Sequence, residues 1–376
     1  MKNRRFFMVI ALVTWLGGAL FAAEIELKQQ FSAWFSLNDD KPSTPRFGLR
    51  YQPTFSLAKA MGTDWKLDSE VSLDMYASGS AADWHAPDVA GEIKPYRLWL
   101  RLSSSRFEAR LGLQKINFGS ATVFRPLMWF DRIDPRDPLQ ITNGVYGLLF
   151  RYYFKSNANI WLWGLYGNPD PKGWETQQTA DNTPEFGGRF QTPLFSGEAG
   201  VTGHFRRLDP GSNAAATRPM ESRFALDGKW DLGVGLWAEA AFVHLDDPAA
   251  TFSWQRSFVL GIDYTFKLGN GLYLLAEQFF SQEATSLFGT GADGASFSAL
   301  LARYPLSVLD NLGAVIYFDW RHDQMYSFAS WQRTYDRWQF HVMLFWNPRQ
   351  AQIVQLQSGN NLFSGKGFQF MVVWNI

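Results

Sequence analysis

The sequence contains no cysteine, which excludes disulfide scaffolds, thiolate metal sites, cysteine nucleophiles and lipoprotein anchoring. Neither charge is in excess, because 35 Lys and Arg residues balance 35 Asp and Glu residues in a chain of 376. This balance gives no support to a nucleic-acid-binding surface, so no nucleic-acid partner is expected. Only 19% of the residues are charged and 46% are hydrophobic, a composition that also excludes intrinsic disorder.

Aromatic residues are abundant, with 33 Phe, 17 Trp and 13 Tyr making up 17% of the chain. Length alone would allow two or three soluble domains of about 100–200 residues each. A soluble core has little use for so many Trp and Tyr side chains beside so few charges. The composition therefore favours a chain with a large surface outside water.

The N-terminus has the form of a secretory signal. Lys2, Arg4 and Arg5 form a positive head, and an apolar stretch ending in small residues follows from Phe6 to Ala23. We expect a signal peptide at residues 1–22 and a mature chain of residues 23–376. The alternative is an uncleaved membrane anchor, for which the apolar run is barely long enough.

No second apolar run approaches the ~18–20 residues that a membrane-spanning helix requires. The mature protein is therefore either soluble and secreted, or it crosses a membrane as a β-barrel, the other fold that satisfies every backbone group in lipid.

Most of the mature chain alternates between apolar and polar residues with a period of two. Between residues 66 and 76, for example, Leu67, Leu73 and Met75 lie on one side while Asp68 and Asp74 lie on the other. This period predicts a strand with one apolar and one hydrated face.

The pattern predicts 18 strands, or ~20 residues for each strand and its connection, which suits spanning strands of about 9–11 residues. The clearest are Lys66–Tyr76, Arg97–Leu102, Phe107–Gln114, Tyr146–Phe154, Glu198–Phe205, Phe224–Trp230, Leu236–His244, Phe258–Phe266, Leu312–Trp320, Trp338–Trp346 and Phe368–Ile376. Weaker candidates are Leu27–Leu37, Phe47–Leu57, Asn159–Gly167, Glu185–Gln191, Tyr273–Gln282, Phe297–Tyr304 and Tyr326–Arg333.

Short and long connections alternate between these strands. Tight links such as 103–105 and 231–233 are separated by longer stretches rich in Gly, Pro, Asn and Asp, such as 78–92, 115–144 and 168–184. Short periplasmic turns and long extracellular loops are typical of outer-membrane barrels. Trp and Tyr residues near strand ends, Trp163 among them, are expected to form girdles at the membrane interfaces.

The C-terminal strand alternates Phe368, Phe370, Val372 and Trp374 with other residues and ends at Ile376. It resembles the C-terminal assembly signal of bacterial outer-membrane barrels, with Ile376 in the place of the usual aromatic residue. We therefore predict an all-β fold, a transmembrane antiparallel β-barrel of about 18 strands, with 16 as the alternative. Its expected location is the outer membrane of a Gram-negative bacterium, in contact with outer-membrane lipid and lipopolysaccharide.

With the apolar face outward, the other face lines the interior. The predicted pore-lining residues are Arg97, Arg101, Arg110, Arg151, Arg189, Glu239, Asp263, Glu277 and Asp319. In a closed barrel of 18 strands, the strands of Arg97 and Glu277 face each other, so a basic wall and an acidic wall would create a transverse field that selects solutes by charge. Alternatively, these charges pair with their neighbours and fill space.

The longest connection, residues 115–144, is too apolar for a solvated loop, and its prolines keep it out of regular structure. We expect it to fold into the barrel and narrow the pore; the alternatives are a position over the rim or against a partner. The predicted constriction residues are Phe124, Arg125, Trp129, Asp131, Arg132, Asp134 and Arg136.

Two short stretches resemble porin-like outer-membrane proteins, including the alginate-export-like group. They are Gly112-Leu-Gln114-Lys-Ile116-Asn-Phe118-Gly119 and Ile133-Asp-Pro135-Arg-Asp137, which match a Gly-x-Gln-x-Ile-x-aromatic-Gly strand end followed by a Pro-x-Asp loop. The resemblance implies a trimeric or monomeric barrel that passes small solutes or an anionic polymer. A polyanion exporter would need a strongly basic lumen, whereas here inward carboxylates nearly match inward arginines.

Catalytic motifs are not evident. A barrel lipase needs a Ser–His pair with an orienting Asn, and a barrel protease needs His and Asp facing each other at the mouth. None of the five histidines (His85, His204, His244, His322 and His341) has such a setting, and no metal or cofactor motif is visible.

The sequence therefore predicts a porin-like channel for passive diffusion of small hydrophilic solutes, without enzymatic activity. A homotrimer is one of the oligomeric states that the sequence allows. The alternatives are an exporter or sheath for a polysaccharide or protein partner and, less favoured, a barrel hydrolase.

Overall fold

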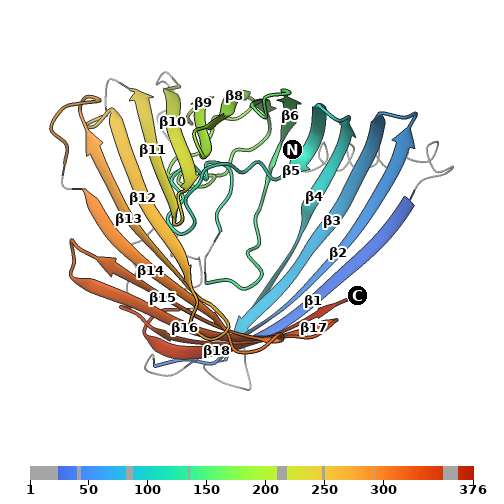
Figure 1. The fold of residues 1–376 in the computed structure, drawn as a ribbon, viewed down its shortest axis with the longest axis vertical. Helices are drawn as coiled ribbons and strands as arrows, with labels where there is room; N and C mark the ends of the chain where they lie inside the picture. The colour runs from blue at the N-terminus through green and yellow to red at the C-terminus, as the bar shows by residue number, and fades with distance from the viewer. Residues whose placement is uncertain are drawn as a thin grey trace.

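The computed structural model describes residues 24–39, 44–81, 88–133, 136–209, 218–247, 250–292, 294–349 and 363–376. The expected signal peptide, residues 1–22, lies outside the described residues. Within the described ranges the chain forms a single sheet of 18 antiparallel strands, which confirms the predicted fold and strand number (Figure 1). Its strands are β1 Glu24–Asn38, β2 Arg46–Met61, β3 Trp65–Ser80, β4 Asp88–Ser103, β5 Phe107–Gln114, β6 Val145–Tyr153, β7 Asn159–Leu165, β8 Glu185–Leu194, β9 Gly197–Arg207, β10 Met220–Asp231, β11 Gly235–Asp246, β12 Trp254–Phe266, β13 Leu272–Ala284, β14 Ala295–Pro305, β15 Asp310–Asp319, β16 Gln324–Thr334, β17 Trp338–Trp346 and β18 Lys366–Asn375.

The sheet closes into a barrel because its first and last strands pair. Phe31 of β1 lies opposite Tyr51 in β2 and opposite Trp374 in β18. At this seam the backbones of Gln29 and Ile376 exchange hydrogen bonds of 3.0 and 2.8 Å. Closure leaves no free sheet edge, which is the condition for placing strands in a bilayer. Among the described residues, no helix is long and apolar enough to cross a membrane.

Strand connections alternate in length as predicted. Short turns at 104–106, 232–234 and 335–337 lie at one end of the barrel, and long loops such as 115–144 and 166–184 begin at the other.

Two strands on one side of the barrel are longer than predicted. The region 78–92 was expected to be a loop, but β3 continues to Ser80 and β4 already begins at Asp88, so the two strands remain paired over most of it. The pattern missed this extension because small and charged residues there interrupt the alternation of apolar and polar side chains.

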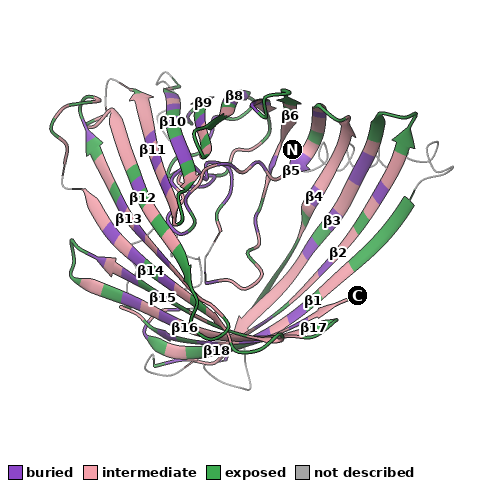
Figure 2. Cartoon of the chain, in the orientation of Figure 1, coloured by how far each residue is buried: buried purple, intermediate pink, exposed green. Residues whose placement is uncertain are grey.

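The two faces of the sheet differ in exposure, which Figure 2 shows as stripes along the strands. On β12 the outward Leu260 is 62% exposed, whereas the neighbouring inward Val259 is 1% exposed. The outward face is apolar around the ring, including Phe224, Leu300 and Leu344. This is the surface expected to contact lipid.

Three inward tryptophans each lie over a glycine on the next strand. The directly paired residues are Trp34 with Gly48, Trp163 with Gly187 and Trp237 with Gly261. A Cβ atom at any of these glycines would collide with the opposite indole ring. Glycine allows a barrel strand to bend, and the indole ring fills the space that a side chain at that position would occupy. Trp163 therefore lies inside the barrel, not in the outer girdle predicted for it.

We expect Gly261→Ala to destabilise the barrel, because the added methyl group overlaps the Trp237 ring and forces it to move. The cost of such overpacking is about 1–3 kcal/mol, which thermal unfolding of the refolded barrel, followed by circular dichroism, would reveal as a lower midpoint. Gly164→Ala is the matched control, since its Cβ would meet Phe186 at an ordinary 3.6 Å. Equal midpoints for the two variants would contradict this prediction.

Candidate functional site: the lumen and its inward loop

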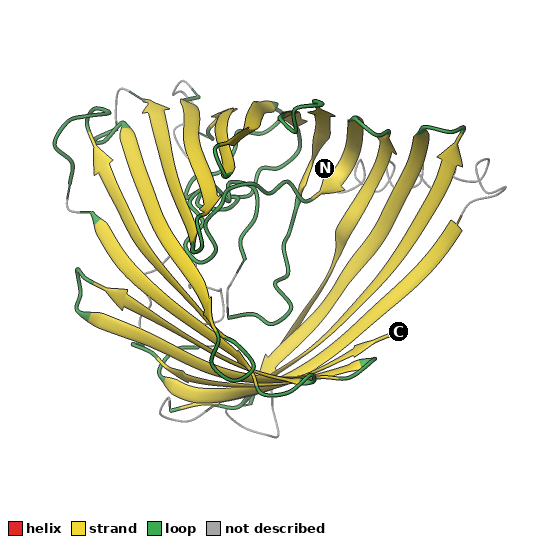
Figure 3. Ribbon diagram, viewed as in Figure 1, coloured by secondary structure: helices red, strands yellow, loops and turns green. Residues whose placement is uncertain are grey.

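Residues 115–144, which connect β5 to β6, are termed the inward loop. Figure 3 shows this connection inside the ring of strands, and its apolar side chains are buried there. These side chains are Ile116, Phe118, Val123, Phe124, Leu127, Met128, Trp129 and Phe130, each at most 7% exposed. The loop thus packs against the inner wall, which accounts for an apolar content that solvated loops lack.

Two carboxylates on the barrel wall hold the backbone of the inward loop. Glu277 of β13 accepts N–H groups from Thr122 at 2.6 Å, Val123 at 3.0 Å and Phe124 at 2.9 Å. The indole N–H of Trp237 donates to the same carboxylate at 3.0 Å. Hydrogen bonds to an ionised acceptor are among the strongest in proteins, and here they satisfy backbone groups that have no strand partner.

Glu239 of β11 makes a parallel set of contacts. It accepts the N–H of Ala121 at 2.6 Å and that of Leu127 at 3.4 Å. Gly119 permits this approach, because its φ is +98° and a Cβ atom there would collide with Glu239. Together the two carboxylates fix residues 121–127 against one wall.

Aromatic stacking supports both parts of the loop. Phe124 stacks on Phe279 of β13 with ring centroids 5.3 Å apart. Phe118 stacks on Trp163 of β7 at 5.6 Å and meets Trp129 edge-on at 5.4 Å. These contacts add dispersion and burial to the hydrogen bonds of the carboxylates.

The far end of the loop is attached to other walls. Arg97 of β4 donates to the carbonyl oxygen of Thr142 at 3.1 Å. Leu139 packs against a small cluster on β1 and β18 that includes Trp34, and the guanidinium of Arg136 lies 4.6 Å from the ring centroid of Phe363. The inward loop therefore contacts several sides of the inner wall.

A second loop, residues 166–184, also turns inward, which the sequence did not predict. Trp174 stacks on Phe279 at 5.5 Å and donates its indole N–H to the carbonyl of Arg125 at 2.9 Å. Glu175 pairs with Arg206 at 2.9 Å and Arg223 at 2.8 Å. The sequence feature that could have indicated this inward position is Trp174 beside Glu175, in a loop otherwise rich in polar residues. Arg132, a predicted constriction residue, joins the two loops by donating to the carbonyl of Gly173 at 2.6 Å.

Three of the predicted pore-lining arginines gather around one carboxylate. The distances to Glu108 are 2.9 Å from Arg110, 3.7 Å from Arg151 and 3.9 Å from Arg101. The guanidinium of Arg151 also lies 3.8 Å from the ring centroid of Trp161. The three side chains are 15–28% exposed, so they remain accessible from the lumen.

Arg189 is placed differently. It is buried and forms a two-pronged pair with Asp227, with one N–O distance of 2.8 Å. Its charge is neutralised within the wall beneath the ring of Phe118.

The acidic wall expected opposite the arginines does not form. Glu239 and Glu277 are buried beneath the inward loop, and Asp319 is buried at the end of β15, where it accepts from the backbone of Arg321 and pairs with His322 at 2.7 Å. These carboxylates satisfy local donors, so they present no free charge to the lumen. This outcome corresponds to the alternative of local pairing, and it corrects the transverse field.

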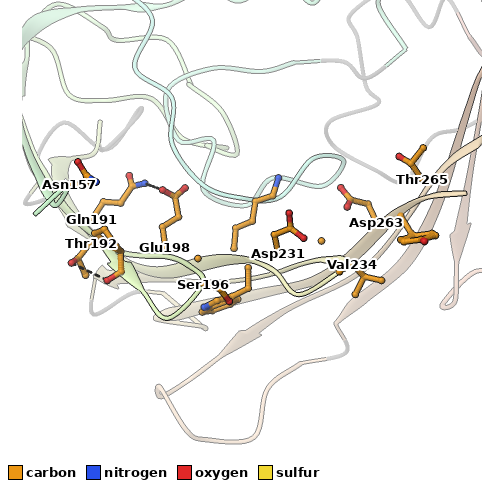
Figure 4. Close-up of a pocket in the computed structure, with 16 residues that line it drawn as sticks. Asn157, Gln191, Thr192, Ser196, Glu198, Asp231, Val234, Asp263 and Thr265 are labelled. Carbon is orange, nitrogen blue, oxygen red and sulfur yellow. Dashed lines mark hydrogen bonds between the residues drawn. The ribbon is translucent and has the colours of Figure 1, made fainter. Parts of the chain in front are cut away.

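Asp263 is the exception among the predicted carboxylates. It accepts from the Tyr273 hydroxyl at 2.9 Å and lines a cavity of about 710 Å³ at the short-turn end of β8–β12. Figure 4 shows it in this cavity with Asp231 and Glu198.

Asp134, predicted in the constriction, lies outside the described residues.

The described histidines are buried, stacked on an aromatic ring or paired with a carboxylate. His204 is fully buried between the indole N–H of Trp163 at 3.2 Å and Glu185 at 3.1 Å. His244 stacks on Trp254 with centroids 4.5 Å apart, and His341 is buried in β17; His85 lies outside the described residues. Within the described ranges no group of three His, Asp or Glu side chains could hold a metal ion.

The sequence matches no protein-family model and no curated protein. Solved structures do resemble it. One is the anion-selective porin from Comamonas acidovorans, with a TM-score of 0.51 and 12% identity, over 94% of this chain and 100% of that one. Another is OmpF of Salmonella typhi in complex with daunomycin, with a TM-score of 0.53 and 10% identity, over 94% of this chain and 97% of that one. A third is the trimer form of OmpT, an outer-membrane protein of Vibrio cholerae, with a TM-score of 0.52 and 13% identity, over 94% of this chain and 100% of that one.

The chain has the fold of outer-membrane porins. At these identities the likeness establishes the fold alone. The resemblance noted in the sequence is confirmed to this extent.

We expect Glu277→Ala to loosen the inward loop, because three backbone N–H groups lose their acceptor, each at a cost of about 1–3 kcal/mol. Single-channel recording should give a larger or noisier conductance, and the unfolding midpoint should fall. Glu283→Ala is the control, since Glu283 lies on the same strand with an exposed side chain. Unchanged conductance and midpoint in Glu277→Ala would show that the carboxylate does not hold the loop.

Proposed function

We propose that the protein is an outer-membrane channel for passive diffusion of small hydrophilic solutes, which it selects by size and charge. The observation that supports this most directly is the inward loop, held within a closed barrel by the carboxylates of Glu239 and Glu277. A barrel of 18 strands encloses a wide lumen. A fixed loop reduces that lumen to a narrower passage while the wall remains closed.

Selection by charge is assigned to the arginines on one wall. Basic side chains outnumber carboxylates on β4–β6, which carry Lys94, Arg97, Arg101, Arg110 and Arg151 against Asp88, Glu92 and Glu108. A cleft with an excess of one charge concentrates counter-ions and hastens their passage. The channel should therefore favour anions, without the strongly basic lumen expected of a polyanion exporter.

The apolar outer surface contacts outer-membrane lipid and lipopolysaccharide in this proposal. A homotrimer is the proposed assembly, supported by the trimer form among the similar structures. Enzymatic activity is not part of the proposal, because the similar structures are porins and each described histidine is buried, stacked or paired with a carboxylate.

Planar-bilayer recording of the refolded mature chain tests the proposal. We expect discrete conductance steps, and deletion of Phe118–Gln140 should raise their size several-fold because the passage is then limited by the barrel alone. A folded barrel, verified by circular dichroism, that gives no steps would contradict channel function. Equal steps with and without the loop would contradict its role as the constriction.

A further prediction concerns the arginines around Glu108. Replacing Arg101, Arg110 and Arg151 together by Gln should move the reversal potential in a salt gradient toward cation selectivity. The triple Lys variant keeps the charges and should retain the original sign. Arg207→Gln serves as a control on the exposed surface. If the Gln triple keeps the original reversal potential, these arginines do not govern selectivity.

A further inference from the structure

Buried N–H groups without an acceptor gather on three neighbouring strands, near the end of the barrel where the short turns lie. They are Nε of Arg110 on β5, Nε of Arg151 on β6 and the indole Nε1 of Trp161 on β7, none of which has a hydrogen-bond partner among the described residues. Glu108 lies 2.9 Å from Arg110 and 3.7 Å from Arg151, and Trp161 is directly opposite Arg151 in the sheet. The three groups therefore share one small area of the inner wall. Buried donors normally have an acceptor, so this cluster needs a physical explanation.

Arg151 is the least engaged of these side chains. Within the described ranges its guanidinium donates no hydrogen bond, and its contact with Glu108 is an ion pair of 3.7 Å. The guanidinium instead lies 3.8 Å from the ring centroid of Trp161, and the side chain is 16% exposed. Stacking on an indole fixes the plane of a guanidinium without using its N–H groups. These donors therefore remain available to an acceptor in the lumen.

The two neighbouring arginines are also incompletely paired. Arg101 and Arg110 lie directly opposite each other on β4 and β5, and like charges in that position destabilise a sheet. Arg101 donates one hydrogen bond to Asp68 at 3.1 Å, and Arg110 donates one to Glu108 at 2.9 Å. Asp68 is shared in turn with Lys66 at 2.9 Å. These carboxylates balance much of the charge, but they accept few of the N–H groups that the arginines offer.

We infer that Arg101, Arg110 and Arg151 bind the oxyanion group, a carboxylate or a phosphate, of a solute that passes through the channel. This inference rests on the proposed channel function and names the class of solute that the arginine wall takes. Planar guanidiniums present pairs of N–H groups that match two oxygens of one oxyanion, a geometry that a halide ion does not use. A bound oxyanion would also offset the repulsion between Arg101 and Arg110 and the cost of donors left without an acceptor.

Binding differs from the selection by charge that is assigned to the same arginines. A field attracts every anion and depends on the number of charges, whereas a binding point saturates and depends on the geometry of its donors. Lysine carries the same charge as arginine, but it has neither the fork of donors nor the flat face that stacks on Trp161. Arg151→Lys therefore separates binding from charge selection.

The test is block of chloride current through the wild-type channel by acetate and, separately, by phosphate. In Arg151→Lys the half-blocking concentration of at least one of these anions should rise roughly tenfold, the loss expected for a charge-assisted hydrogen bond. The reversal potential in a salt gradient should keep its sign, because no charge is removed. Arg101→Lys repeats the test at a side chain that is 28% exposed, where the substitution is easily accommodated.

Arg303→Gln is the matched control. Arg303 lies on β14, away from the arginine wall, and its side chain is exposed. The substitution removes a whole charge, yet it should leave the half-blocking concentrations unchanged. Circular dichroism verifies that each variant forms the barrel.

The outcomes separate the two claims. Wild-type steps with equal half-blocking concentrations in the wild type and in both Lys variants would overturn the oxyanion site and leave the channel function standing. A loss of block in Arg303→Gln as large as that in Arg151→Lys would also overturn the site, because the effect would not depend on these donors. Wild-type protein without steps would overturn the channel, and calorimetric titration of the folded wild type and Arg151→Lys with phosphate or acetate would then still test the site.

Discussion

Hydrogen bonds from the backbone of the inward loop to Glu239 and Glu277 are the constraint on which the lumen depends. A segment that leaves the sheet and enters the barrel carries N–H groups without strand partners, and burying them unsatisfied is costly. The wall supplies carboxylates at the positions where residues 121–124 and 127 arrive. Phe124 and Phe118 can then pack on opposite sides of this anchored stretch.

This use of carboxylates decides the electrostatics of the interior. Once Glu239, Glu277 and Asp319 accept from local donors, they are buried and no longer oppose the arginines across the lumen. Arg189 is likewise neutralised by Asp227. Cationic side chains that remain accessible lie on β4–β6. The anion preference of the proposed channel thus follows from which charges the loop leaves free.

Much of the fold could be predicted from the sequence, because a lipid-facing strand imposes a period of two that no long-range contact alters. That period located all 18 strands, and the apolar content of residues 115–144 indicated that they are not solvated. The partner of a charged side chain, by contrast, cannot be predicted from the local pattern of the sequence. Whether Glu277 faces water or a loop amide depends on residues some 150 positions away, as its contacts with Thr122 and Phe124 show.

Four of the seven strands with weaker alternation have a physical reason for it. β7, β13, β14 and β16 were weaker candidates, and their inward residues Trp163, Leu275, Phe279, Phe297 and Phe328 belong to the two clusters that hold the inward loop. Their outward residues, such as Leu274 and Phe280, remain apolar for lipid. A strand that is apolar on both faces loses its period of two. Alternation alone does not mark the whole wall on which the inward loop packs, because the clearly alternating β6, β12, β15 and β17 contribute Leu149, Val259, Tyr317 and Phe345 to the same clusters.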